Sequence, residues 1–154
     1  MENISKHITY KEATHSNTAT RKGITNSPDA EQLVRMKALA KHILEPTREY
    51  FGKPIYYNSF FRCITLNQVL GGSNTSDHVT GNAADIDTKG QEGFSNADLF
   101  NHIKETYDFD QLIWEFGDDN EPDWVHVSYR AENNRNQVLR AKRIDGVVRY
   151  NHYI

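Results

Sequence analysis

The run from Ser76 to Asp85, SDHVTGNAAD, constrains this chain more than any other segment. It places the imidazole of His78 and the carboxylate of Asp85 on either side of Gly81, and a glycine lets the chain turn sharply because it has no Cβ. A third group of the same kind, His126, follows in the segment WVHVS. Two histidines and one aspartate can hold a zinc ion and leave one tetrahedral position open for water, as in catalytic rather than structural zinc sites. The sequence therefore predicts a fold that brings His78, Asp85 and His126 together around one zinc ion.

The composition predicts one globular domain over residues 1–154, because 37% of the chain is hydrophobic and 25% is charged. The net charge of −3 and the pI near 6.1 argue against nucleic-acid binding, which needs a basic face. Cys63 is the single cysteine, which excludes an intrachain disulfide and a thiolate metal cluster.

Targeting signals are not visible in the sequence. Residues 1–7 contain no apolar stretch like that of a secretory signal peptide, and no run approaches the ~18 apolar residues of a membrane span. We therefore expect a protein that is made in the cytoplasm without a signal peptide and is not inserted in a membrane. We also expect it to be a monomer. Action on a target outside the cell would require release by another factor.

The first third of the chain has a helical pattern. The segment TYKE at Thr9 matches a capping box that opens a short helix, and the polar residues 14–26 predict a loop. The dipeptide Ser27-Pro28 predicts the start of a long helix, because serine caps helices well and proline suits the first turn. We expect that helix to end at Gly52 and to be kinked or split at Pro46.

The remainder of the chain predicts mainly strands. Aromatic and β-branched runs indicate strands at 54–62, 83–88, 111–116 and 124–129, and helical spacing indicates short helices at 64–70 and 95–107. The dipeptide Asp145-Gly146 indicates a hairpin over about residues 139–150. Together these elements predict an α+β fold with a small, largely antiparallel sheet flanked by helices.

Alternation along the strands predicts which side chains share a face. Asp85 shares a face with Asp87, and His126 shares one with Trp124 and Ser128. A histidine between two valines can instead be a core residue with its hydrogen bonds satisfied. His126 is therefore a strong ligand candidate only in combination with His78 and Asp85.

The run SDHVTGNAAD resembles the S-x-H-x-x-G-x-A-x-D signature of zinc D-alanyl-D-alanine carboxypeptidases and related phage endolysins. These proteins share the lysostaphin, carboxypeptidase and Hedgehog metallopeptidase fold. The segment WVHVS resembles the strand that carries the second zinc histidine of the family, and the resemblance extends over about residues 4–130. It implies a Hedgehog-like or D-Ala-D-Ala-peptidase-like fold and a zinc ion bound by His78, Asp85 and His126. Each fixed position of the signature matches: Ser76, His78, Gly81, Ala83 and Asp85.

Zinc-dependent hydrolysis also needs a general base, and the sequence leaves two candidates open. Asp123 precedes His126 in the pattern Asp-x-x-His, and members of the family carry an acidic base at that spacing. Glu115, in the segment QLIWEFG, resembles a glutamate that other branches hold beside the zinc ion. Each residue also has a simpler interpretation, Asp123 as a turn acid after Pro122 and Glu115 as a solvated strand residue.

Two further residues are candidate substrate contacts. Arg62, in the segment SFFR, resembles the arginine of the S-G-Y-R segment of the family, which holds substrate or transition-state charge. A guanidinium suits a peptide carboxylate or a developing oxyanion. Phe60 stands where the family has glycine, and Arg62 can also be a surface residue at a strand end. Ser76 is expected to orient the loop or to contact substrate, with a plain turn role as the alternative.

The resemblance implies a zinc metallopeptidase that cuts peptide bonds in bacterial peptidoglycan stem peptides, as a carboxypeptidase or an endopeptidase. The expected context is that of a bacteriophage lysin, which degrades the cell wall after its release. An alternative is a non-catalytic zinc-binding or structural module, because Hedgehog-like proteins keep zinc on this fold without an established peptidase role. A weaker alternative is a zinc amidase that cuts the sugar–peptide link. The acidic candidates and Arg62 favour an enzyme.

Overall fold

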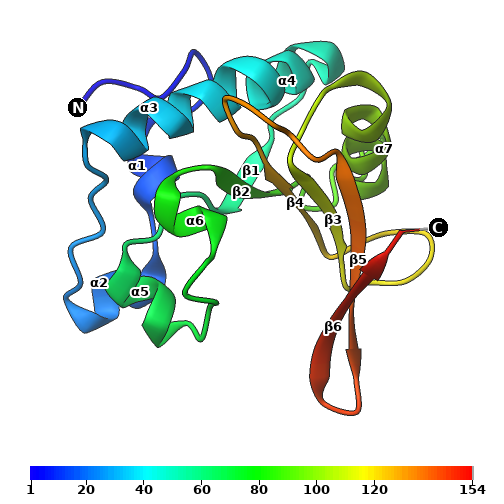
Figure 1. Cartoon of the computed structure of the whole chain (residues 1–154). Coiled ribbons are helices and arrows are strands. Elements are labelled where there is room, and N and C mark those ends of the chain that lie inside the picture. The colour runs from blue at the N-terminus through cyan, green and yellow to red at the C-terminus, as the bar shows by residue number, and fades with distance from the viewer. Residues whose placement is uncertain (154) are drawn as a thin grey trace.

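The computed structural model describes residues 1–153 and shows a single mixed sheet with its longer helices packed on one face (Figure 1). The strand order is β1-β2-β4-β3-β5-β6; β3 and β5 pair in parallel, and every other neighbouring pair is antiparallel. The predicted α+β class with a largely antiparallel sheet is therefore confirmed. The strands are β1 (Tyr56–Ser59), β2 (Ala83–Asp87), β3 (Gln111–Glu115), β4 (Trp124–Ser128), β5 (Gln137–Ile144) and β6 (Val147–His152).

The helices are mostly short. They are α1 (Tyr10–Thr14), α2 (Asn17–Lys22), α3 (Ala30–Leu39), the π-helix η1 (Ala40–Leu44), α4 (Glu45–Phe51), α5 (Ile64–Val69), α6 (Asp77–Thr80) and α7 (Asn96–Thr106). Among residues 1–153, none of these helices combines the length and the apolar sequence that a membrane span requires.

The hydrophobic core lies between the helices and one face of the sheet. The α3–η1–α4 and α7 segments bury residues such as Leu39, Ile43 and Phe100 against Ile86 and Val125 of the central strands. Side chains alternate along a strand, so the residues that precede and follow each core residue in these strands point to the opposite face of the sheet. That second face has only a small apolar cluster among the described residues, and it is where the polar site residues lie.

The long helix begins later than the sequence predicts. Asp29, not Ser27, is the N-cap: its side chain accepts a hydrogen bond from the backbone N–H of Gln32, and the Gln32 side chain bonds to the backbone N–H of Asp29. This reciprocal capping box satisfies two donors at once, which a serine two residues earlier does not. The chain is not split at Pro46: the residues are helical without interruption from Ala30 to Phe51, and a π-helical turn over Ala40–Leu44 precedes α4 and accommodates a residue that lacks an N–H.

Two further expectations need correction. Residues 14–26 are not all loop, because they include α2, which Ser16 caps and the left-handed Gly23 ends. The predicted strand 54–62 is shorter, since only Tyr56–Ser59 pairs with β2. The predicted hairpin is present, and its two-residue turn has positive φ at both Asp145 (52°) and Gly146 (77°), as a type I′ turn requires.

Candidate functional site

The sheet register places two of the candidate ligands side by side. Asp85 of β2 pairs directly with His126 of β4, which in turn pairs with Ile113 of β3. Directly paired residues of antiparallel strands point to the same face. Trp124 and Glu115 form the next pair on that face. The alternation that the sequence predicts for β2 and β4 therefore brings Asp85, His126 and Trp124 onto the face opposite the helical core.

The third ligand, His78, reaches this face from the short helix α6. Gly81 ends that helix with a φ of 87°, and a Cβ on Gly81 would lie 2.6 Å from the backbone oxygen of Gln32. Only glycine fits this turn, for both reasons. The imidazole of His78 is fixed by a 2.8 Å hydrogen bond between its Nδ1 and the backbone oxygen of Phe60. Its Nε2 is thereby directed at Asp85, 3.3 Å from Oδ1.

The three side chains form a compact and largely buried cluster. The Nδ1 of His126 lies 2.9 Å from Oδ1 of Asp85, and one ligand atom from each residue lies within 4.8 Å of the other two. His78 and Asp85 are 3% and 7% exposed. Two nitrogen donors and one oxygen donor fit a zinc ion, and the hydrogen bond from His78 Nδ1 to a backbone oxygen is the kind of support that orients zinc-bound histidines. His78, Asp85 and His126 therefore have the geometry and the chemistry of a metal centre.

The carboxylate and the imidazoles of the cluster stabilise each other's charged forms. Burial by itself raises the pKa of Asp85, but the charge of His78 and the hydrogen bonds from both imidazoles outweigh burial and hold that pKa well below its usual range. Burial lowers the pKa of His126, while its hydrogen bond to Asp85 and the negative charge of Asp85 raise it, and the net shift is upward. The carboxylate is thus ionised throughout the neutral range and available as a metal ligand.

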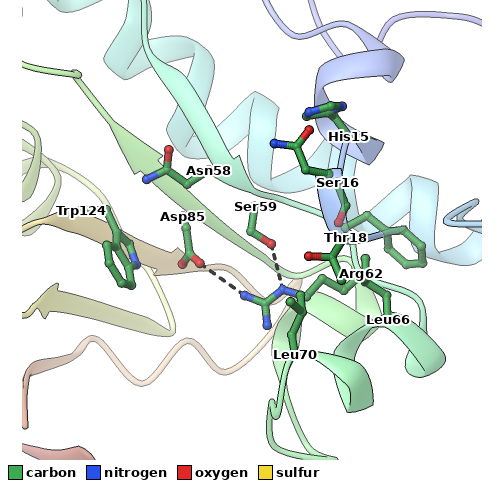
Figure 2. Close-up of a pocket in the computed structure, with 12 residues that line it drawn as sticks. His15, Ser16, Thr18, Asn58, Ser59, Arg62, Leu66, Leu70, Asp85 and Trp124 are labelled. Carbon is green, nitrogen blue, oxygen red and sulfur yellow. Dashed lines mark hydrogen bonds and ion pairs between the residues drawn. The ribbon is translucent and has the colours of Figure 1, made fainter. Parts of the chain in front are cut away.

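Arg62 lies against the outer oxygen of Asp85. Its Nη2 is 3.4 Å from Oδ2 of Asp85, its Nε donates to Ser59 Oγ at 2.8 Å and its Nη1 donates to Asn67 Oδ1 at 3.2 Å, and Figure 2 shows the first two contacts. Asn67 is fully buried and donates to the backbone oxygen of Ser73. Arg62 is therefore held by three side chains beside the cluster and is not a free surface residue.

A cavity of about 550 Å³ opens over the cluster, and we call it the hairpin cavity because Leu139 and Tyr150 of the β5–β6 hairpin form one wall. Its floor includes His78, Asp85, His126 and Glu115, and Arg62, Trp124 and Ser76 also line it. Its volume lies within the roughly 300–1,000 Å³ that is typical of small-molecule sites. The candidate ligands, Arg62 and Ser76 all meet in this one cavity.

The two candidate bases are placed differently. Glu115 is 6% exposed and lines the hairpin cavity, and burial, with a contribution from the charge of Asp85, raises its pKa to about 7. Asp123 is exposed, precedes β4 and donates its backbone N–H to the backbone oxygen of Glu115 at 2.9 Å. In the described part of the chain, Asp123 is not among the residues that line the hairpin cavity. The interpretation of Glu115 as a solvated strand residue is wrong because its side chain is buried.

Asp77 and Asp87 are the two other acids near the cluster, and each contacts different groups. Asp77 also lines the hairpin cavity, where its Oδ1 lies 3.9 Å from Nη2 of Arg130. Asp87 accepts hydrogen bonds from Asn58, Asn96 and the backbone of Lys89, so it braces the end of β2.

Tyr150 is a cavity residue that the sequence does not reveal. It pairs with Ala141, and Ala141 pairs with Glu115, so Tyr150 lies in the same row of the sheet with only a small side chain between them. Alternation along the hairpin could have shown that Tyr150 shares a face with His152. No local signal could have shown that β5 pairs in parallel with β3.

Comparison with known proteins agrees with this geometry. A sequence model of the family described as Peptidase M15 matches residues 6–128, which is most of the chain and includes the three candidate ligands, Arg62 and Glu115. The β5–β6 hairpin lies outside the matched residues. No curated protein matches the chain.

Proposed function

The chain belongs to the Peptidase M15 family, and from this premise we propose that it is a zinc metallopeptidase that hydrolyses peptide bonds in bacterial peptidoglycan stem peptides. The observation that carries the proposal is the convergence of His78, Asp85 and His126 in a cavity that also holds a buried acid and an arginine. We further propose a role in cell-wall degradation like that of phage lysins. Its support is the match of the run SDHVTGNAAD to the signature of the endolysin and carboxypeptidase family.

In the proposed site, His78 Nε2, a carboxylate oxygen of Asp85 and a ring nitrogen of His126 would hold the zinc ion. A zinc ion bound by three protein ligands lowers the pKa of a coordinated water to about 7 and polarises a carbonyl group. The protein contributes the orientation of the ligands, because Phe60 fixes the ring of His78 and strand pairing fixes Asp85 against His126. It also excludes most of the bulk water, since His78 and Asp85 are buried.

We propose Glu115 as the general base. Its carboxylate lines the hairpin cavity beside His126, and burial raises its pKa to about 7 in the absence of zinc, which favours uptake of a proton near neutral pH. Glu115 takes a proton from the attacking water and later delivers it to the amine that leaves. The exposed Asp123 is the lesser candidate because its side chain lies outside this cavity.

Arg62 is proposed to stabilise negative charge on the substrate. Three of its five N–H donors are in use: the one on Nε is directed at Ser59, one on Nη1 at Asn67 and one on Nη2 at Asp85. The other two remain for a carbonyl oxygen that becomes negative during the reaction. A donor held in place before the reaction begins stabilises such charge without reorganising.

The test is digestion of purified peptidoglycan by the zinc-loaded protein, followed by mass spectrometry of the released fragments. We expect new stem-peptide fragments that are absent with His78→Ala and strongly reduced with Glu115→Gln. Fragments that persist with His78→Ala would contradict a metal-dependent reaction. Zinc binding without fragments from several wall types would favour the non-catalytic module, and release of intact stem peptides from the sugar would favour the amidase.

A further inference from the structure

A second cavity adjoins the His78–Asp85–His126 cluster on the side of strand β1. It has a volume of about 380 Å³ and is lined by Asn58 and Ser59 of β1 and by residues 15–18 at the start of α2, and we call it the β1 cavity. Figure 2 shows its polar groups, with Ser16 and Thr18 on one side and Trp124 on the other. Both cavities are within the size range of ligand sites.

The two cavities meet at the cluster itself. Arg62, Asp85 and Trp124 line both of them. The β1 cavity extends toward the edge strand β1, while the hairpin cavity extends toward β5 and β6 at the opposite edge of the sheet. The candidate metal centre therefore lies between two spaces and not at the closed end of one.

The charges that line the cavities bear on which end of a peptide can be held. An enzyme that removes a terminal residue needs a fixed cation to neutralise the carboxylate of that residue, because an unpaired charge is costly to desolvate. Among the described residues, Arg62 is the one lysine or arginine that lines either cavity, and it lies where the cavities meet. Within residues 1–153, the outer part of each cavity is therefore lined by no lysine or arginine that could pair with a terminal carboxylate.

Trp124 also indicates a ligand that passes through the junction. The Nε1–H of its indole is buried and has no acceptor within residues 1–153. Buried donors are nearly always paired, so such a group is expected to find an acceptor in a bound state. A peptide that crosses the junction supplies backbone carbonyl oxygens of the right kind.

We propose that the protein is an endopeptidase, whose substrate is an internal peptide segment that occupies the hairpin cavity on one side of the cleaved bond and the β1 cavity on the other. This inference rests on the proposed hydrolytic function. Water adds across the internal C–N bond, so that one fragment leaves with a new carboxylate and the other with a new amine. Neither product needs a free terminus in the substrate.

The first experiment compares the peptide L-Ala-D-Glu-L-Lys-D-Ala-D-Ala in its free form and with an acetylated amino end and an amidated carboxyl end. Hydrolysis by the zinc-loaded wild type is followed by liquid chromatography and mass spectrometry. We expect the capped peptide to be cleaved at an internal bond with a kcat/KM within about threefold of the free peptide, since its ends make no required ion pair. Loss of cleavage on capping either end would overturn the proposal and favour an exopeptidase.

The second experiment fills or enlarges each cavity and measures binding, so that it does not depend on turnover. In a Glu115→Gln background, which is expected to bind without cleaving, Thr18→Arg blocks the β1 cavity and Tyr150→Ala opens the hairpin cavity. The matched controls are Thr20→Arg, an exposed position of the same helix, and Val147→Ala on the opposite face of β6. Calorimetry with the capped pentapeptide and with the shorter peptide N-acetyl-D-Ala-D-Ala gives the dissociation constants.

We expect Thr18→Arg and Tyr150→Ala each to weaken binding of the pentapeptide about tenfold, or about 1.4 kcal/mol, while the controls stay within about twofold. At least one of the two variants should leave binding of the dipeptide unchanged. Equal loss for both peptides, or no loss, would overturn the two-cavity arrangement. A wild type that binds the pentapeptide with this dependence but cleaves nothing would instead contradict the proposed function.

Discussion

Asp85 and Asp110 are both buried carboxylates at the sheet, yet their partners differ in kind. Asp110 is fully buried and accepts hydrogen bonds from Nε of Arg130 at 3.0 Å and from Nε and Nη2 of Arg135 at 2.9 and 2.8 Å. The backbone N–H of Arg135 adds a further bond at 3.2 Å. Asp85 instead has two imidazoles on one oxygen and a single guanidinium nitrogen on the other.

The difference separates a structural ion pair from a candidate metal centre. A guanidinium can only donate hydrogen bonds, so the surroundings of Asp110 have no capacity to bind a cation. A neutral imidazole can exchange its hydrogen bond to a carboxylate for a bond to a metal, so the surroundings of Asp85 can change partners. Asp85 also lines a cavity, whereas Asp110 lines neither of the two cavities described above.

The largest expected effect is loss of function at Asp85. We expect Asp85→Asn to lower zinc affinity by more than about 100-fold, since even residues that only support zinc ligands account for roughly 10–100-fold. Peptide hydrolysis should fall to background. Plasma emission spectrometry of metal content and a hydrolysis assay measure the two effects. If zinc binding in this variant equals that of the wild type, Asp85 is not a ligand.

Substitution of Glu115 should lower activity almost as much as substitution of Asp85, whereas substitution of Asp123 should not. We expect Glu115→Gln to lower kcat by about 10²–10⁴-fold, the range typical of a lost general base, with zinc retained. Asp123→Asn is the matched control and should stay within about threefold of the wild type in kcat. Steady-state kinetics with metal analysis of each variant measure this. The opposite ranking would assign the base to Asp123.

The pKa of Glu115 gives this comparison a pH dependence. In the zinc-free protein its pKa is raised to about 7, so the carboxylate that acts as base forms as the pH rises through that value. Zinc should lower this pKa, because a nearby cation favours the ionised form. Carboxyl-carbon NMR titration with and without zinc measures both values. An upward shift on zinc binding would mean that Glu115 does not face the metal.

Asp110 should matter for stability and not for zinc. We expect Asp110→Asn to lower the free energy of unfolding by roughly 2–4 kcal/mol, because it removes hydrogen bonds between charged groups at a buried site. Zinc affinity should change by less than about threefold. Urea denaturation and calorimetric zinc titration provide the two measurements. A zinc effect as large as that of Asp85→Asn would remove the distinction between the two carboxylates.

The smallest expected effect is the acid sensitivity that Asp110 confers. Hydrogen bonds from Arg135, opposed by burial and aided by the charges of both arginines, hold the pKa of Asp110 below its usual value of 3.8. The unfolded chain therefore binds this proton more readily. The contribution to stability is complete above the unfolded pKa and is lost as the pH falls through the folded pKa. Urea denaturation at a series of acidic pH values should show that the free energy of unfolding falls less steeply with decreasing pH for Asp110→Asn than for the wild type.

Much of the candidate ligand set follows from local sequence. Gly81 requires a turn that only glycine can make, and alternation along β2 and β4 orients Asp85 and His126. These are short-range rules, because they depend on backbone sterics and on the period of a strand. The Asp145-Gly146 hairpin follows from the same kind of rule.

Other features were not predicted, although the hydrogen bonds that define them are local. The length and polarity of residues 14–26 did not indicate α2, whose caps, Ser16 and Gly23, resemble ordinary loop residues. The start of α3 depended on whether Ser27 or Asp29 found a reciprocal partner. Local propensity allowed both solutions in each case, and only the folded chain distinguishes them.

The sequence by itself indicated the three candidate ligands and the α+β class, because the run SDHVTGNAAD, the segment WVHVS and the periodicity of apolar residues can all be recognised along the chain. The tertiary structure decided that Glu115 lies in the cavity while Asp123 is exposed, because burial of the opposite face of β3 against the helices sets the direction of its side chain. It also decided that Tyr150 reaches the same cavity, through a parallel pairing of β3 with β5. Such pairings are set by the shape of the whole core, and no spacing along the chain encodes them.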